Sequence, residues 1–153
     1  MVQKKLNKGI LNTLNLNLSH KFINLLMLNG KKNVAQKILL DTLTLIKAET
    51  KQHPMQILRI AIKNVAPIVE VRSIRKRRTY FSVPVPLRKS YRISLAIKWI
   101  IKHARSKKGT PIEVRLKDEL LLAYKKQGAS IKDKKKIYKQ AGANRAFLFF
   151  RWF

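Results

Sequence analysis

The chain has 153 residues, of which 35 are lysine or arginine and 7 are aspartate or glutamate, so its formal net charge is +28. This length fits a single domain with one modest apolar core. The hydrophobic fraction of 46% excludes a disordered basic tail, because such tails lack the apolar surface needed to fold. A folded domain this cationic repels itself, and a polyanion would relieve that repulsion. We therefore expect a nucleic acid as partner and no membrane partner, although an anionic membrane face is the other polyanion to consider.

Several function classes are excluded or disfavoured by composition. With no cysteine, the chain has no disulfide, thiolate metal site or cysteine nucleophile. No apolar run approaches the roughly 18 residues of a membrane span. The three histidines, His20, His53 and His103, lack the spacing of a metal site. We expect neither metal nor cofactor.

Catalysis also has little to use. The acidic residues show no paired spacing suited to acid–base chemistry, and Glu119 is expected to be a salt-bridge partner. The five glycines form no phosphate-binding loop. The chain is therefore predicted not to be an enzyme.

The N-terminal half reads as an extension followed by helices. Residues 1–17 have no clear period and are predicted to be an N-terminal extension, with a single helical domain over 18–153. Ser19 is expected to cap the first helix, which Gly30 ends. A helical period continues through residues 35–46, and a third helix is expected to begin at Pro54, a favourable first-turn residue, and to stop at Pro67.

Between about residues 68 and 86 the pattern changes to that of a two-stranded ribbon. Apolar and charged residues alternate over 69–72, and residues 79–83 are β-branched and aromatic. Pro84 and Pro86 confine the end of the second strand to an edge. Because an isolated ribbon is marginal in water, it must pack against the helices or RNA.

Three more helices are predicted after the ribbon. The clearest apolar stripe runs over 93–104, and Thr110 to Glu113 form a capping box with proline at the first helical position. That helix closes at Gly128, and Ser130 begins the last helix, with Asp133 near its positive end. One face of the last helix is expected to carry Ile137, Ala141, Asn144 and Leu148. The predicted fold is mainly α, a six-helix domain with a projecting two-stranded β-ribbon.

The ribbon carries the sharpest candidate binding site. Arg72, Arg75, Lys76, Arg77 and Arg78 place five cations in seven residues, around a turn where glycine or asparagine is usual. Such a run can be a solvated surface. Cations at a turn repel one another unless phosphate lies between them, and the planar arginine group suits phosphate. We therefore predict RNA contact.

Two aromatic residues and two further basic patches join this candidate site. Tyr80 and Phe81 are candidates for stacking on an unpaired base, although one of the pair is expected to pack inward. No acidic residue stands between Glu70 and Glu113, which favours phosphate contact over a merely solvated face for the fourth predicted helix. That patch consists of Arg88, Lys89, Arg92, Lys98, Lys102 and Arg105, and a smaller patch consists of Lys31 and Lys32.

A series of short fragments, in order along the chain, resembles one known family. The fragments are Lys21-Phe22-Ile23-Asn24, Leu26-Met27, Gly30-Lys31-Lys32, Asn64-Val65, Pro67, Glu70-Val71-Arg72, Val83-Pro84-Val85-Pro86, Leu95-Ala96-Ile97-Lys98-Trp99, Glu119-Leu120, Gly128, Ile131-Lys132, Ala143-Asn144-Arg145-Ala146-Phe147 and Arg151-Trp152. Together they resemble the small-subunit ribosomal protein family numbered seven in the bacterial and organellar scheme. The resemblance covers about residues 21–152.

The resemblance implies a six-helix fold with a ribbon and binding to the small-subunit ribosomal RNA in the 3′ major domain, which forms the head. It implies early binding that helps the head assemble. It also implies a ribbon near the mRNA and the exit-site tRNA, and neighbouring head and platform proteins, among them the one numbered eleven. By matching position, RNA contact falls on Lys31, Lys32, Arg72, Arg75, Arg92 and Lys98.

The chain departs from the family pattern in two places. Arg77-Arg78 replaces the usual glycine pair, so the tip is expected to be wider or to be held by RNA. Residues 1–17 do not resemble the usual N-terminal arm. With a lysine, asparagine, isoleucine and leucine bias typical of AT-rich genomes, these departures predict an organelle-encoded protein of a mitochondrial ribosome. A plastid or bacterial cytoplasmic ribosome is the alternative.

Three other functions remain open at this point. A DNA-compacting architectural protein would also be basic and helical. A cationic membrane-surface protein would need amphipathic helices with exposed aromatic residues. An RNA-modifying enzyme would need uncommitted acids or a cysteine, which the chain does not supply.

Overall fold

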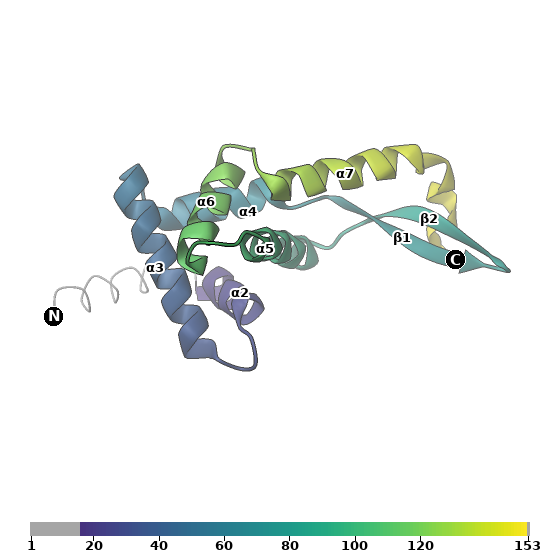
Figure 1. Ribbon diagram of the computed structural model, residues 1–153. Coiled ribbons are helices and arrows are strands. Elements are labelled where there is room, and N and C mark those ends of the chain that lie inside the picture. Colours follow the sequence, from purple (N-terminus) through teal and green to yellow (C-terminus); the bar gives the residue numbers. More distant parts are fainter. Residues whose placement is uncertain (1–15, 153) are drawn as a thin grey trace.

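The computed structural model describes residues 16–152, and Figure 1 shows the arrangement of the helices and the ribbon. Within this part of the chain there are six α-helices, one 3-10 helix and one two-stranded ribbon, which confirms the predicted fold class. The elements are α2 (Leu16–Leu26), α3 (Lys32–Thr50), α4 (Pro54–Val65), β1 (Val69–Lys76), β2 (Thr79–Pro86), α5 (Lys89–Ser106), α6 (Ile112–Tyr124), α7 (Ala129–Ala143) and the 3-10 helix η1 (Arg145–Trp152).

The core lies where α2 to α6 meet. Phe22, Leu43, Leu58, Ile97 and Leu120, one from each of these helices, are fully buried there. On α5 the apolar residues recur at the helical period, so the stripe predicted from the sequence faces inward. Because the apolar faces of these helices pack into this core, the cationic side chains of the same helices lie on the outside.

The ribbon projects from the helical body with α7 and η1 beside it (Figure 1). Helix α7 runs along β1, and η1 folds back over β2. The ring of Phe81 lies 5.4 Å from that of Phe147 and 4.9 Å from that of Phe150, between ring centroids. The ribbon thus has an apolar cover of its own, as expected for a strand pair that would be marginal alone.

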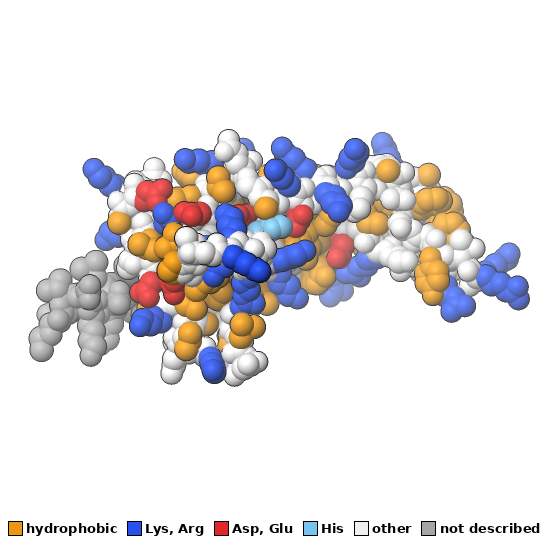
Figure 2. Space-filling view, viewed as in Figure 1, with side chains coloured by type: hydrophobic (Ala, Val, Ile, Leu, Met, Phe, Trp, Pro, Cys, Tyr) orange, Lys and Arg blue, Asp and Glu red, His pale blue; other side chains and the backbone are white. Residues whose placement is uncertain are grey.

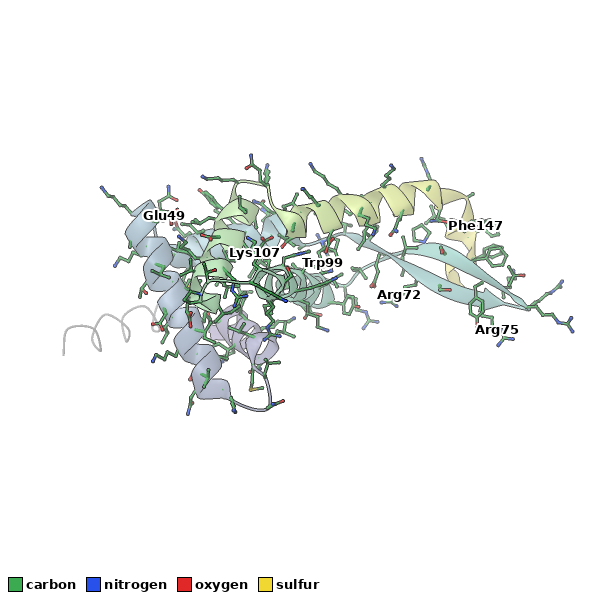
Figure 3. All side chains as sticks on the ribbon, viewed as in Figure 1. Glu49, Arg72, Arg75, Trp99, Lys107 and Phe147 are labelled. Atoms are coloured by element: carbon green, nitrogen blue, oxygen red, sulfur yellow. The ribbon has the colours of Figure 1, made fainter. Side chains whose placement is uncertain are left out.

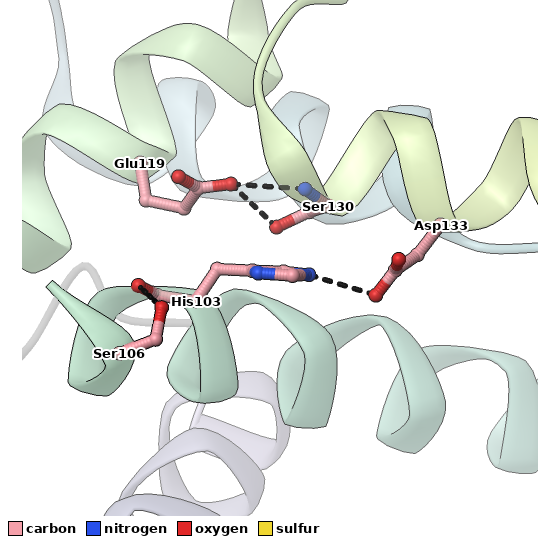
Figure 4. Close-up of polar contacts among 5 residues, drawn as sticks. All are labelled: His103, Ser106, Glu119, Ser130 and Asp133. Carbon is pink, nitrogen blue, oxygen red and sulfur yellow. Dashed lines mark hydrogen bonds and ion pairs between the residues drawn. The ribbon is translucent and has the colours of Figure 1, made fainter.

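Helix α7 is attached to the body by a buried carboxylate, shown in Figure 4. Glu119 of α6 accepts hydrogen bonds at one oxygen from the backbone N of Ser130 (3.1 Å) and from its hydroxyl (2.6 Å). The Nζ of Lys107 lies 3.5 Å from the other oxygen, so the expected salt-bridge role of Glu119 is confirmed. A carboxylate at the first turn of a helix also interacts favourably with the helix dipole. Glu119 therefore acts as an N-terminal cap supplied by another helix.

Helices α2 and α6 do not begin as predicted. Ser19 is buried inside α2, which starts at Leu16, so the expected capping role is wrong. Residues 1–15 of the predicted extension lie outside the described part of the chain. Pro111 precedes α6 as its cap residue with an extended backbone, and no side chain caps that helix, so the predicted capping box is wrong too.

The last helix also differs from its prediction. It begins at Ala129 and ends at Ala143, so Leu148 lies in η1 instead of on the helical face that also holds Ile137. Asp133 does not cap it. Its Oδ2 lies 2.7 Å from the Nε2 of His103 on α5 (Figure 4), which ties α7 to the body at a second point.

Replacing Gly128 by alanine should destabilise the junction between α6 and α7. Gly128 has a φ of +97° and a ψ of 174°, a region that is essentially glycine-only. An added Cβ would lie 3.0 Å from the Cβ of Leu122 and 3.3 Å from a carboxylate oxygen of Glu119. We expect Gly128→Ala to lower the free energy of unfolding by roughly 1–3 kcal/mol in urea titrations.

Gly142→Ala is the matched control, because Gly142 is helical and an added Cβ there meets nothing within 4 Å. It should be neutral or stabilising by up to about 1 kcal/mol. Equal effects of the two substitutions would contradict the close packing at Gly128.

Candidate nucleic-acid interface

Charge is unevenly distributed over the described surface. Five of the seven acidic residues lie on α3 and α6, whereas α2, α4, α5 and β2 carry none. The other two are paired, Glu70 with Arg72 and Asp133 with His103. On the face seen in Figure 2 the acidic side chains lie over the helical body and the start of the ribbon, and the charged side chains at the ribbon tip are all lysine or arginine. The basic surfaces of the ribbon tip and α5 therefore have few internal counter-charges.

The ribbon tip is tighter than predicted. Lys76 pairs with Thr79, so Arg77 and Arg78 alone form the turn. The first alternative, a wider tip, is therefore wrong, and the second, a tip held by RNA, stays a prediction. Arg77 takes a left-handed conformation with a φ of 56°, which costs arginine roughly 1–2 kcal/mol. The Nε of Arg75 donates to the carbonyl oxygen of Arg77 (3.3 Å), which helps to hold that turn.

The other ribbon cations, Arg72 and Lys76, also make internal contacts. The Nε of Arg72 lies 3.4 Å from a carboxylate oxygen of Glu70, yet the Arg72 side chain remains 54% exposed. The Nζ of Lys76 lies 4.4 Å from the ring centroid of Phe150. Arg72 and Arg75 extend outward from the ribbon, whereas Phe147 lies close to it (Figure 3). The guanidinium groups are thus accessible to an external anion.

Of the two candidate stacking residues, one packs inward and the other is exposed, as expected. Phe81 is half-buried against η1, whereas Tyr80 is 66% exposed, with the Arg75 guanidinium carbon 5.9 Å from its ring centroid. An exposed ring beside a cation suits an unpaired base. Phe149 of η1, 61% exposed, is a further ring that sequence reasoning missed, since its segment was assigned to the last α-helix.

The basic patch on α5 is partly committed to internal contacts. Arg88, Lys89, Lys98, Lys102 and Arg105 are exposed. Arg105 nevertheless donates from Nη2 to the carbonyl oxygen of Leu26 (2.7 Å), the last residue of α2, and so caps that helix. Side chains of Lys98, Lys102 and Arg105 line one shallow surface pocket, so the structure brings these three predicted residues together.

The smaller patch lies at the start of α3. Lys31 is the cap residue and Lys32 the first helical residue, and both are exposed with no side-chain cap and no acid in the first turn. A helix N-terminus already carries partial positive charge. Two lysines there therefore add to a potential that favours an anion.

The direction of the ribbon is set at its root by side chains from two helices. The Nε of Arg92 on α5 donates to the carbonyl oxygen of Pro67 (2.9 Å). The backbone N of Ile68 donates to the hydroxyl of Tyr138 on α7 (3.0 Å), and the Nζ of Lys134 donates to the carbonyl oxygen of Asn64 (2.7 Å). We call these three contacts the root clamp. No sequence pattern indicates them, because the partners lie far apart along the chain.

One member of the root clamp, Lys134, has a shifted pKa. Partial burial, together with the nearby charges of Arg92 and Lys126, lowers the pKa of Lys134 below its ordinary value. The unfavourable crowding of cations at the ribbon root would be relieved by a bound phosphate.

Removing the hydroxyl of Tyr138 should loosen the ribbon. Because Tyr138→Phe deletes one acceptor and keeps the ring, we expect a broader distribution of ribbon directions at a cost of about 0.5–1.5 kcal/mol. The chain has no cysteine, so Ala48→Cys on α3 and Ser73→Cys on β1 allow spin-label distance measurements.

Tyr91→Phe is the control for that experiment, because Tyr91 is an exposed tyrosine of α5 whose hydroxyl takes part in none of the root-clamp contacts. The distance distribution should keep its width in this variant. An unchanged width in Tyr138→Phe as well would show that the clamp does not set the ribbon direction.

The described residues support neither a membrane-spanning helix nor a metal site. Residues 16–152 contain no helix long and apolar enough to cross a membrane. The same part of the chain has no group of three or more histidine, cysteine, aspartate or glutamate side chains placed to hold a metal ion.

Comparison with known proteins decides the family. The model of the family described as ribosomal protein S7p/S5e matches residues 3–145. The chain belongs to the S7p/S5e family of ribosomal proteins. It is therefore a ribosomal protein with a structural role and not an enzyme. The match includes most of residues 1–17, so the family resemblance extends further towards the N-terminus than the fragments indicated.

Bacterial relatives support this assignment. The small ribosomal subunit protein uS7 of Thermotoga maritima is 41% identical over 86% of this chain and 85% of its own length. Proteins of the same name from Thermosipho melanesiensis (42% identical) and Petrotoga mobilis (44%) share the same coverage. This membership sets aside the DNA-compacting, membrane-surface and RNA-modifying alternatives.

Proposed function

We propose that this protein binds small-subunit ribosomal RNA in the 3′ major domain and holds the RNA helices of the head together. As a member of the S7p/S5e family it is a structural constituent of the small ribosomal subunit. The observation that carries the RNA-binding proposal is the segregation of charge, with α5 and the ribbon tip free of acids. Such a surface meets phosphate without internal competition.

The mechanism is neutralisation of phosphates on a rigid frame. Lysines and arginines of α5, of the α3 start and of the ribbon replace the counterions of several RNA helices, which releases those ions. The apolar core and the root clamp hold the cations at fixed separations, so RNA segments that would repel one another keep one relative pose. Shape and phosphate, more than base edges, set recognition of the paired parts.

The projecting ribbon supports a more specific assignment. Its tip combines Arg77 and Arg78 with the exposed ring of Tyr80, at the end of an arm that leaves the helical body. This chemistry suits single-stranded RNA, so we place the tip near the mRNA and the exit-site tRNA. Neighbouring head and platform proteins, including the one numbered eleven, complete the proposed surroundings.

The ribosome that contains this protein is of the bacterial type, as its relatives are. Within that class we propose a mitochondrial ribosome and an organelle-encoded chain. The support is the lysine, asparagine, isoleucine and leucine bias and the arginine pair at the ribbon tip.

Neutralising the ribbon tip should weaken RNA binding and flatten its salt dependence. Arg75→Gln, Arg77→Gln and Arg78→Gln together remove up to three phosphate contacts. The slope of log affinity against log salt should therefore fall in magnitude by about 2–3. Titration of the small-subunit 3′ major domain RNA at several salt concentrations measures this.

A triple variant with Lys37→Gln, Lys47→Gln and Lys125→Gln changes the net charge equally, but at exposed positions of α3 and just after α6, near the acidic residues. Its slope should stay close to that of the wild type. Equal slopes for the two triple variants would show that only overall charge matters and would refute the proposed role of the tip.

A further inference from the structure

A hollow between α4 and α5 is not explained by the surfaces described so far. Its volume is about 400 Å³, and its lining includes the apolar side chains of Ile62, Ala66 and Ile93. Volumes of about 300–1,000 Å³ are typical of small-ligand sites. Ile62 and Ala66 are themselves buried, so this part of the floor belongs to the folded body.

Cations alone provide the charged part of the lining. Arg59 and Lys63 come from one face of α4, four residues apart, and Lys89 and Arg92 come from α5. No acidic side chain lines the hollow. Arg92 is held in place by its bond to the carbonyl oxygen of Pro67, so at least one of these cations is fixed before any ligand arrives.

An apolar floor with a cationic rim selects among ligands. A bare phosphate would use the rim and leave the floor in contact with water. A paired RNA helix presents its phosphates but keeps its base faces stacked inside. An unpaired nucleotide has both a flat apolar base and a phosphate on each side, and so matches floor and rim together.

We propose that this hollow binds one unpaired nucleotide of RNA, with the base on the floor of Ile62, Ala66 and Ile93 and its flanking phosphates on the rim cations. The proposal rests on the RNA-binding function proposed above and adds to it a site for a single nucleotide. It gives Arg59 and Lys63, which no sequence pattern singled out, a role in binding.

Methyl NMR of the full-length protein tests the site directly. The probes are hexauridylate, hexaadenylate, a 12-base-pair RNA duplex and inorganic phosphate, and the reporters are the Ile62 and Ile93 methyl groups. We expect either hexanucleotide to shift both methyl signals, whereas the duplex and phosphate leave them in place. Equal shifts with inorganic phosphate would show a simple anion site and overturn the proposal.

A filled pocket provides the matched variant. Ala66→Met extends a flexible side chain into the hollow, and Ala143→Met makes the same change at an exposed position of α7. Loss of the apolar contact between base and floor, worth about 1.5–3 kcal/mol, corresponds to a loss of about 10- to 150-fold in hexanucleotide affinity for Ala66→Met. Affinity for the duplex should not change, and Ala143→Met should behave as the wild type.

Two rim substitutions keep the test decisive if Ala66→Met does not fold. Arg59→Gln and Lys63→Gln are exposed changes that should weaken hexanucleotide binding and reduce its salt slope by about 1–1.5. Hexanucleotide binding that leaves the Ile62 and Ile93 signals and the rim variants unaffected would overturn this site while leaving the RNA-binding function intact. Failure of both hexanucleotide and duplex to bind at low salt would overturn that function as well.

Discussion

The arrangement of the proposed RNA-binding surfaces depends on how α7 is fixed to the helical body. The carboxylate of Glu119, buried at the start of α7, accepts two hydrogen bonds from Ser130, and Asp133 meets His103 one turn further on. From there α7 runs along β1 and brings η1 over β2. A change in the angle at which α7 leaves the body would therefore move the ribbon, its apolar cover and its cationic tip together.

The placement of the few acidic residues explains how so cationic a chain keeps a defined shape. Its few acidic residues lie mainly on α3 and α6, where helices join. Glu49 of α3, for example, accepts a hydrogen bond from the Nζ of Lys117 on α6 (2.7 Å). These contacts strengthen the body against self-repulsion without neutralising α5 or the ribbon tip. Stability and binding thus use largely different parts of the charge distribution, although Arg72, a predicted RNA contact, also pairs with Glu70.

Sequence reasoning found what local pattern encodes. The apolar stripe of α5, the start of α4 at Pro54 and the alternation in the ribbon are periodic signals, and the structure has these elements at the expected places. The cap assigned to Ser19 failed because α2 already begins at Leu16, so Ser19 lies buried inside that helix. Asp133 was expected only near the positive end of the last helix, and its carboxylate contacts His103 of α5. The root clamp and the hollow between α4 and α5 join distant segments, and no periodicity of one sequence reveals such pairings.

The aromatic contact between η1 and β2 has a consequence for the order of events during synthesis. Phe81 is made before α5, α6 and α7, whereas its partners Phe147 and Phe150 follow all three helices. The arm with the highest density of arginine is therefore the last part of the described fold to gain its apolar support. The apolar cover of the ribbon is therefore completed only after translation has passed η1.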